Sequence, residues 1–168
     1  MHTALRLSLL ILIVAGICPV AAETKAPASV EVRVLSFETA QQLALSAARA
    51  CRRQGFQVAV AVVDRNGQLL AFARDPLAGP HTIAVSQAKA YSAATFQTPT
   101  SQMRGREALQ AAPGVLLVGG GVPVRVGGYF YGAVGVSGAP AKKVTGDQDE
   151  ACARVGIDAI REALEFDQ

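Results

Sequence analysis

Residues 58–73 read VAVAVVDRNGQLLAFA, two β-rich runs joined through the dipeptide Asn66–Gly67. Asn–Gly pairs adopt the positive φ angles that a tight hairpin turn needs, so the stretch predicts two strands, over 58–63 and 69–73. Strands joined by so short a turn must pair antiparallel. This hairpin therefore sets the class of sheet that the chain builds.

Three more strands are predicted in the second half of the chain, after Pro113–Gly114. Runs rich in β-branched and aromatic residues alternate there with glycines that supply the turns. Together with the hairpin they make a five-stranded, mostly antiparallel sheet. The predicted strands cover 115–118, 122–126 and 129–136, with turns at 119–121 and 127–128.

Four helices are predicted around these strands. Ser36 can cap the first helix, Gly55 ends it, and its apolar residues recur at helical spacing. The order of elements is helix, two strands, two helices, three strands, helix, which favours an α+β fold with helices on both faces of the sheet. The predicted helices cover 37–54, 82–96, 101–110 and 148–165.

The composition is that of a folded globular domain. The chain has 168 residues, of which 51% are hydrophobic and 17% charged, with 16 glycines and 8 prolines. This apolar content excludes intrinsic disorder, and the glycine and proline content excludes a collagen-like or low-complexity chain. The formal net charge is +3, and the basic residues are scattered rather than clustered, which argues against a nucleic-acid partner.

The first twenty-two residues are predicted to be a secretory signal peptide that is cleaved after Ala22. Arg6 precedes an uncharged apolar run over 7–17, and small residues follow it. An uncleaved anchor is the alternative, but the run is shorter than the roughly 20 residues of a membrane span. We expect a periplasmic or secreted protein without a membrane span after cleavage. Its parts are the signal peptide 1–22, a lead-in 23–35 and a single domain 36–165.

Cleavage removes Cys18 and leaves Cys51 and Cys152. Two cysteines in an exported chain are a candidate disulfide. In a cytosolic chain the same residues would more simply be small buried apolar side chains.

Catalytic and metal-binding motifs are sparse. Ser137 lacks the glycine two residues later that a nucleophile elbow requires, and the glycine-rich stretch around it misses the spacing of a phosphate-binding loop. His81 is the only histidine left after cleavage. Asp147, Asp149 and Glu150 favour the positive end of the last predicted helix, with metal binding as the alternative. Enzymatic activity stays open, and these residues favour a protein that is not an enzyme.

Three stretches, in their order and spacing, resemble the GlcG/HbpS family, whose domain also forms the C-terminal part of PduO-type corrinoid adenosyltransferases. The first is the hairpin, the second is the alanine-rich helix with Pro99–Thr100 behind it, and the third is the glycine-rich pair of strands. The resemblance covers about 36–165. The stretches read VAVVDRNGQLLAFAR (60–74), HTIAVSQAKAYSAATF (81–96) and GGGVPV (119–124) followed by GAVGVSG (132–138).

The resemblance implies a profilin-like α/β sandwich, homo-oligomers from dimers to octamers, and binding of haem or another tetrapyrrole as the small-molecule ligand. Exported members are linked to haem or iron sensing and to protection against oxidative stress. The adenosyltransferase chemistry belongs to the other domain of the PduO proteins. Two alternatives stay open: a small enzyme or accessory protein of glycolate-type hydroxy-acid metabolism, and a structural oligomer with a vestigial pocket. The chain departs from the family before Pro113–Gly114, where it is shorter than usual.

The resemblance also implies a haem site along the alanine-rich helix. His81, at the start of that helix, is the candidate axial ligand of the haem iron. Thr82, Lys89 and Tyr91 border the implied pocket. The alternative for His81 is a surface histidine without a ligand, and for the other three it is a packing or solvated role.

Further residues carry weaker expectations. Met103 is more simply a core residue than an iron ligand. Arg104 and Arg106 can receive an acidic ligand or serve only solubility. The small side chains of the alanine-rich helix, with Pro99–Thr100, predict a subunit interface, and packing on the chain's own sheet is the alternative.

In the implied fold the first and last predicted helices lie side by side. Cys51 and Cys152 would then face one seam, and a bridge requires Cα atoms within about 7 Å. The resemblance therefore favours a disulfide between them. Two buried free thiols are the alternative.

Overall fold

The structure is a computed structural model that describes residues 26–143 and 145–167. The chain divides into one unit up to Glu31 and a second unit, Val32–Gln168, which contains every described helix and strand. The predicted signal peptide and Cys18 lie outside the described residues. Within the described ranges, no helix combines the length and the apolar character needed to cross a membrane.

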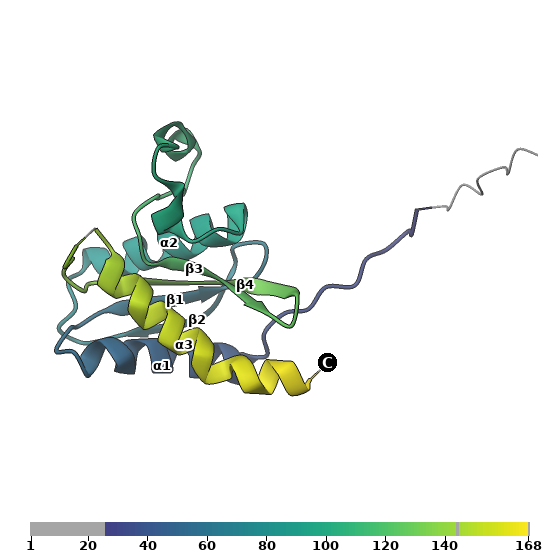
Figure 1. Cartoon of the computed structure of the whole chain (residues 1–168), viewed down its shortest axis with the longest axis horizontal. Helices are drawn as coiled ribbons and strands as arrows, with labels where there is room; N and C mark the ends of the chain where they lie inside the picture. The colour runs from purple at the N-terminus through teal and green to yellow at the C-terminus, as the bar shows by residue number, and fades with distance from the viewer. Residues whose placement is uncertain (1–25, 144, 168) are drawn as a thin grey trace, which may run out of the picture. The chain divides into compact units, whose positions relative to one another are not determined.

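Four strands form one antiparallel sheet in the order β2-β1-β4-β3 (Figure 1). The predicted hairpin is present, because β1 pairs with β2 through the turn at Asn66–Gly67. The outermost strands, β2 and β3, each have one edge that no described strand covers. The strands are β1 (Ala59–Val63), β2 (Leu69–Arg74), β3 (Gly121–Val126) and β4 (Tyr129–Ser137).

The fifth predicted strand, over 115–118, is wrong, although the α+β class is confirmed. The backbone of this run is bonded to side chains rather than to a neighbouring strand. Ser92 Oγ accepts from Leu116 N at 2.7 Å, and Val118 O accepts from Thr100 Oγ1 at 2.8 Å. An apolar run alone does not distinguish these two arrangements.

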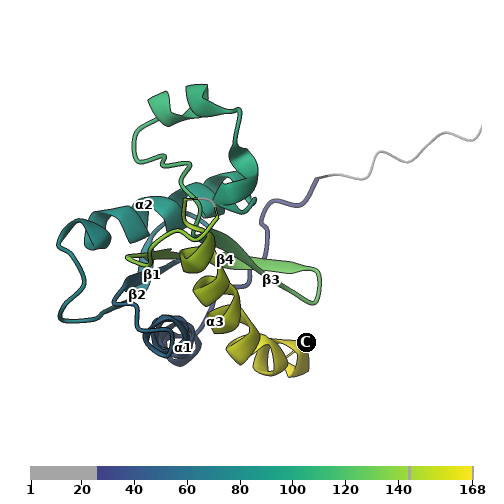
Figure 2. The same cartoon turned by 60° about the vertical axis from the view of Figure 1, so that its left-hand side comes forward.

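The predicted helix over 101–110 is replaced by two short 3₁₀ helices, η1 (Thr100–Met103) and η2 (Glu107–Ala111). We call residues 101–118, which contain most of η1 and all of η2, the arm. Figure 2 shows that the arm rises away from the sheet on the side of the second long helix. Met103 is buried, as a core residue should be.

The three long helices lie on both faces of the sheet, as predicted. Figures 1 and 2 show α1 (Phe37–Arg52) and α3 (Asp147–Phe166) on one face and α2 (His81–Phe96) on the other. Ser36 caps α1, since its Oγ accepts from Thr39 N at 3.2 Å. Alternate residues of β1 serve the two layers, because successive side chains of a strand point to opposite faces. Val60 and Val62 enter the α1–α3 core, while Ala61 and Val63 face α2.

The predicted disulfide between Cys51 and Cys152 is present and joins α1 to α3. Both residues are fully buried, and their Cα atoms are 5.5 Å apart. The first and last helices therefore lie side by side, as the resemblance implied.

Candidate functional site

The candidate site is a groove between α2 and the edge strand β2. Helix α2 packs mainly on β4, β1 and β3, so the α2 side of β2 is left largely uncovered. Strand register places Leu69 opposite Val63 and Phe72 opposite Ala61, on the face toward α2. Leu69 is 50% exposed and Phe72 is 37% exposed. Neighbouring exposed apolar side chains on one strand face make this a candidate binding surface.

The groove has a volume of about 320 Å³ and mainly aliphatic walls. Val63 and Leu69 line it from the sheet, and Ala84 and Ala88 line it from α2. This volume lies at the lower end of the range for small-molecule sites, about 300–1,000 Å³, which are likewise lined mostly by apolar residues. Gln87 and Tyr91 supply the polar side-chain groups.

The Tyr91 ring lies close to two glycines that also line the groove, Gly67 and Gly114. A Cβ atom at Gly67, in the hairpin turn, would lie 2.5 Å from Cδ2 of the Tyr91 ring. A Cβ atom at Gly114 would lie 3.4 Å from the ring on its Cε1 side. Sequence reasoning assigned Gly67 to the turn and missed this second role, which no local pattern reveals.

The four candidate haem contacts do not converge, because α2 turns them to different sides. His81 and Tyr91 lie on the outward side with Ala84 and Ala88, following the three- and four-residue spacing of a helix. Tyr91 lines the groove, and the exposed His81 lies near the residues that line it without being one of them.

Thr82 and Lys89 lie on the buried side of α2, at 0% and 2% exposure. The Thr82 hydroxyl donates to Gly79 O at 2.6 Å, just before the start of the helix. Neither side chain lines the groove.

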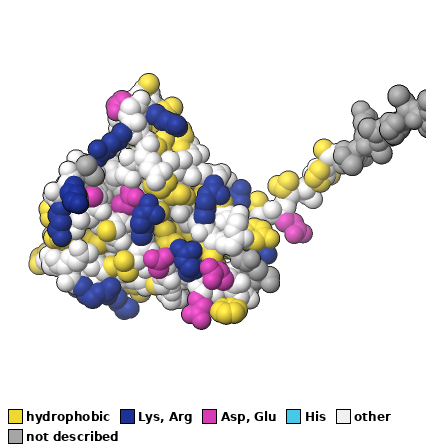
Figure 3. Space-filling model, in the orientation of Figure 1, with side chains coloured by type: hydrophobic (Ala, Val, Ile, Leu, Met, Phe, Trp, Pro, Cys, Tyr) yellow, Lys and Arg dark blue, Asp and Glu magenta, His cyan; other side chains and the backbone are white. Residues whose placement is uncertain are grey.

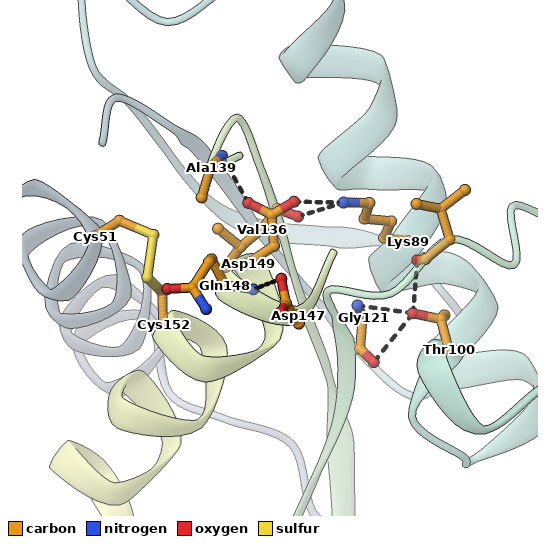
Figure 4. A network of polar contacts seen from close by, with 11 residues as sticks. Cys51, Lys89, Thr100, Gly121, Val136, Ala139, Asp147, Gln148, Asp149 and Cys152 are labelled. Atoms are coloured by element: carbon orange, nitrogen blue, oxygen red, sulfur yellow. Dashed lines mark hydrogen bonds and ion pairs between the residues drawn. A yellow bond between two sulfur atoms is a disulfide. The ribbon is translucent and has the colours of Figure 1, made fainter. Parts of the chain in front are cut away.

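Lys89 belongs to a buried polar network that links three elements (Figure 4). Its Nζ donates to Asp149 Oδ2 at 2.7 Å and to Val136 O at 3.0 Å. The other oxygen of Asp149 accepts from Ala139 N at 2.9 Å. Burial raises the pKa of the Asp149 carboxyl, and the Lys89 ammonium and the Ala139 N–H oppose that rise. Sequence reasoning placed Asp149 at a helix end and did not identify its partner.

The first acid of α3 bonds backbone amides. Asp147 accepts from Lys142 N at 3.1 Å, Lys143 N at 2.8 Å and Gln148 N at 2.8 Å. Over residues 26–143 and 145–167, no group of three or more His, Cys, Asp or Glu side chains is arranged to hold a metal ion.

Comparison with known proteins identifies relatives for this fold. The family described as "Haem degrading protein HbpS-like" matches residues 35–158. The chain is also 35% identical over 109 residues to Protein GlcG of Escherichia coli, an alignment that covers 62% of this chain and 81% of GlcG.

Solved structures share the architecture. A double mutant of HbpS from Streptomyces reticuli superposes with a TM-score of 0.73 and 35% identity, covering 87% of this chain and 99% of the other. A PduOC complex with heme superposes with a TM-score of 0.66 and 26% identity, covering 76% and 95%. These matches confirm the resemblance and the fold that it implied.

Proposed function

This chain belongs to the HbpS-like family, and we propose that it binds haem in the groove between α2 and β2. The observation that carries the proposal is the aliphatic groove beside an uncovered strand face, in a member of this family. Similarity to a solved heme complex of PduOC supports it.

The groove suits a flat, largely apolar macrocycle. Val63, Leu69, Ala84 and Ala88 offer hydrocarbon surface to such a ligand. Covering exposed apolar area releases about 25 cal/mol per Å², so shielding Leu69 and the neighbouring Phe72 favours binding. Haem supplies iron-centred redox chemistry when bound, and these residues provide the apolar contact that holds it.

Tyr91 is the proposed protein ligand of the iron. It is the only residue lining the groove whose side chain is of a type that ligates haem iron. His81 is the alternative. The two lie ten positions apart on α2, about 15 Å along the helix axis, so they cannot both bind one iron. Lys89 and Thr82 are not part of this proposal, because both are buried on the other side of α2.

Haemin titration followed by absorbance tests the proposal. We expect saturable binding with a Soret band, altered in position and weakened in Tyr91→Phe. Tyr129→Phe is the matched control, since Tyr129 is similarly exposed, at 44%, and lies on β4 in the other hairpin. Loss of the band in His81→Ala but not in Tyr91→Phe would identify His81, at the start of α2, as the residue that binds the iron. Absence of saturable binding by the wild type would overturn haem binding itself.

We propose that the protein acts outside the cytoplasm, in haem or iron sensing or in protection against oxidative stress. The signal-peptide pattern of residues 1–22 supports export. The Cys51–Cys152 bond also supports it, because structural disulfides persist mainly in oxidising compartments. Cell fractionation tests the compartment, and survival of a deletion strain under peroxide or excess haem tests the role.

We propose a homo-oligomer, from a dimer to an octamer. Exposed apolar side chains such as Val34, Leu77 and Phe166 support the proposal, because a second subunit would shield them from water. Within the alanine-rich helix, Ala90 and Ala93 are fully buried on the chain's own sheet, so only its outward residues, such as Ala84, are open to a second subunit. Sedimentation at micromolar concentration tests assembly, and a monomer would contradict it.

A further inference from the structure

A second cavity, of about 540 Å³, lies away from the α2–β2 groove, between the arm and the loop that precedes α3. Two walls line it: Arg104, Leu117, Val118 and Gly119 on the arm side, and Ala141, Lys142, Lys143 and Thr145 on the loop side. The two walls meet closely, since a Cβ atom at Gly119 would lie 2.8 Å from Thr145 O. The cavity shares no lining residue with the groove proposed for haem.

Three cationic side chains line the cavity, and no carboxylate does. Elsewhere in the described part of the chain, four cations form ion pairs: Lys89, Arg52, Arg154 and Arg161. Among the described residues, the side chains of Arg104, Lys142 and Lys143 form none. In Figure 3, dark-blue Lys and Arg side chains lie at the upper left, over the arm and the loop, together with magenta acids, and others are spread over the rest of this face.

Asp147, the first residue of α3, holds the loop through hydrogen bonds to its backbone. Its carboxylate accepts the backbone N–H groups of Lys142 and Lys143, at 3.1 and 2.8 Å. These bonds tie two consecutive lysines to the start of α3, where the partial positive charge of the helix N-terminus adds to theirs. The acids bonded to the arm and to the loop, Glu107 and Asp147, leave the three cations in excess.

We propose that this cavity binds a small oxyanion that carries two or more negative charges, a phosphate ester or a polycarboxylate. Arg104 offers a planar fork that matches such oxygens, and the two lysines act as point charges. Thr145 adds a hydroxyl donor. A singly charged acid would leave two of the three cations unpaired, which is why the site selects a multiply charged ligand.

Isothermal titration with inorganic pyrophosphate, citrate and acetate, at constant ionic strength, tests the proposal on the full-length protein. We expect saturable binding of pyrophosphate or citrate and at least about tenfold weaker binding of acetate, in line with the strength of charged hydrogen bonds. The stronger of the two polyanions identifies phosphate or carboxylate as the source of the oxygens.

Two pairs of variants distinguish a specific anion site from attraction by the overall positive charge of the protein. Arg104→Gln should weaken binding at least about tenfold, while Arg106→Gln, an exposed arginine of the same arm outside the cavity lining, should leave it unchanged. Lys142→Gln/Lys143→Gln should act like Arg104→Gln, whereas Arg49→Gln/Arg53→Gln removes the same charge from α1 and its C-cap without effect. Equal losses within either pair, or no saturable binding of either polyanion, would overturn the proposal.

The haem proposal is tested separately. We expect saturating pyrophosphate to leave the haemin titration unchanged, because different residues line the two cavities. Competition between haemin and pyrophosphate would overturn a separate anion site, since the cavity would then serve the carboxylates of haem.

Discussion

The ammonium of Lys89, on α2, lies 2.7 Å from the carboxylate of Asp149, on α3, although the two helices cover opposite faces of the sheet. The two side chains are only 2% and 5% exposed. Val136 O on β4 and Ala139 N complete the network. The pair therefore ties both helix layers to the strand between them.

Lys89→Met should destabilise the protein by about 3–5 kcal/mol near neutral pH, because it leaves a buried carboxylate without its counter-charge. Lys89 lowers the pKa of Asp149, so its removal raises that pKa further above the ordinary 3.8. The folded state then holds a proton that the unfolded chain has released, and the free energy of unfolding falls as the pH rises. Urea unfolding between pH 4 and 8 should show that the free energy of unfolding of Lys89→Met falls below that of the wild type by an amount that grows with pH.

The double variant Lys89→Met/Asp149→Asn is the control for that pH dependence, since it removes both charges. Arg161→Met, which breaks an exposed pair with Asp158, should change stability little. A loss in Lys89→Met that is constant over this pH range would contradict the role of Asp149.

Cys51→Ala/Cys152→Ala should lower the free energy of unfolding by up to about 4–5 kcal/mol, the chain-entropy value for a loop of about 100 residues. The bridge joins residues 101 positions apart and so restricts much of the unfolded chain. Urea unfolding of oxidised wild type, reduced wild type and variant gives the comparison. Alkylation of both cysteines in non-reduced exported protein would show that no bridge forms.

Gly67→Ala should weaken haem binding as well as stability, because its Cβ would lie 2.5 Å from the Tyr91 ring and displace it. Gly128→Ala is a matched control in the other hairpin. The φ angles of Gly67 and Gly128 are +79° and +83°, and a Cβ at Gly128 would meet no atom within 4 Å. Both variants should lose about 1 kcal/mol or more from backbone strain. Only Gly67→Ala should lower the affinity for haemin, and equal affinities would contradict the placement of the ligand beside Tyr91.

The exported protein should begin at or within a few residues of Glu23, because small residues at 20–22 follow the apolar run. Intact-mass measurement on secreted or periplasmic material gives the answer directly. Retention of Met1 on a membrane-bound product would contradict both export and cleavage.

Most secondary structure was predictable, because its signals are local. The Asn66–Gly67 turn and the Ser36 cap depend on the conformations of a few adjacent residues, and both are present as predicted. The run over 115–118 was predicted wrongly because the partners of its backbone are not local. Its backbone partners are side chains of Ser92 and Thr100, and a strand-like composition does not reveal them.

The candidate site was predictable only as far as the helix that carries it. Sequence resemblance pointed to α2, but the packing of α2 on β1, β3 and β4 decides which residues face outward. Tyr91 consequently lines the groove, whereas Lys89 is buried. The groove itself exists because α2 leaves β2 uncovered, which depends on the order of strands in the sheet.

The sequence by itself determined where the three long helices and the two hairpins form, because periodicity, caps and turn residues act over a few positions of the chain. It also determined the family, through three stretches in order. Only the tertiary structure decided which distant groups meet: Lys89 with Asp149 across 60 residues, and Gly67 and Gly114 around Tyr91. The physical reason is that the partners of a buried charge or a packed ring come from elements that are distant in the sequence and adjacent only in the folded layers. Strand register and helix packing set those neighbours, and no local pattern encodes them.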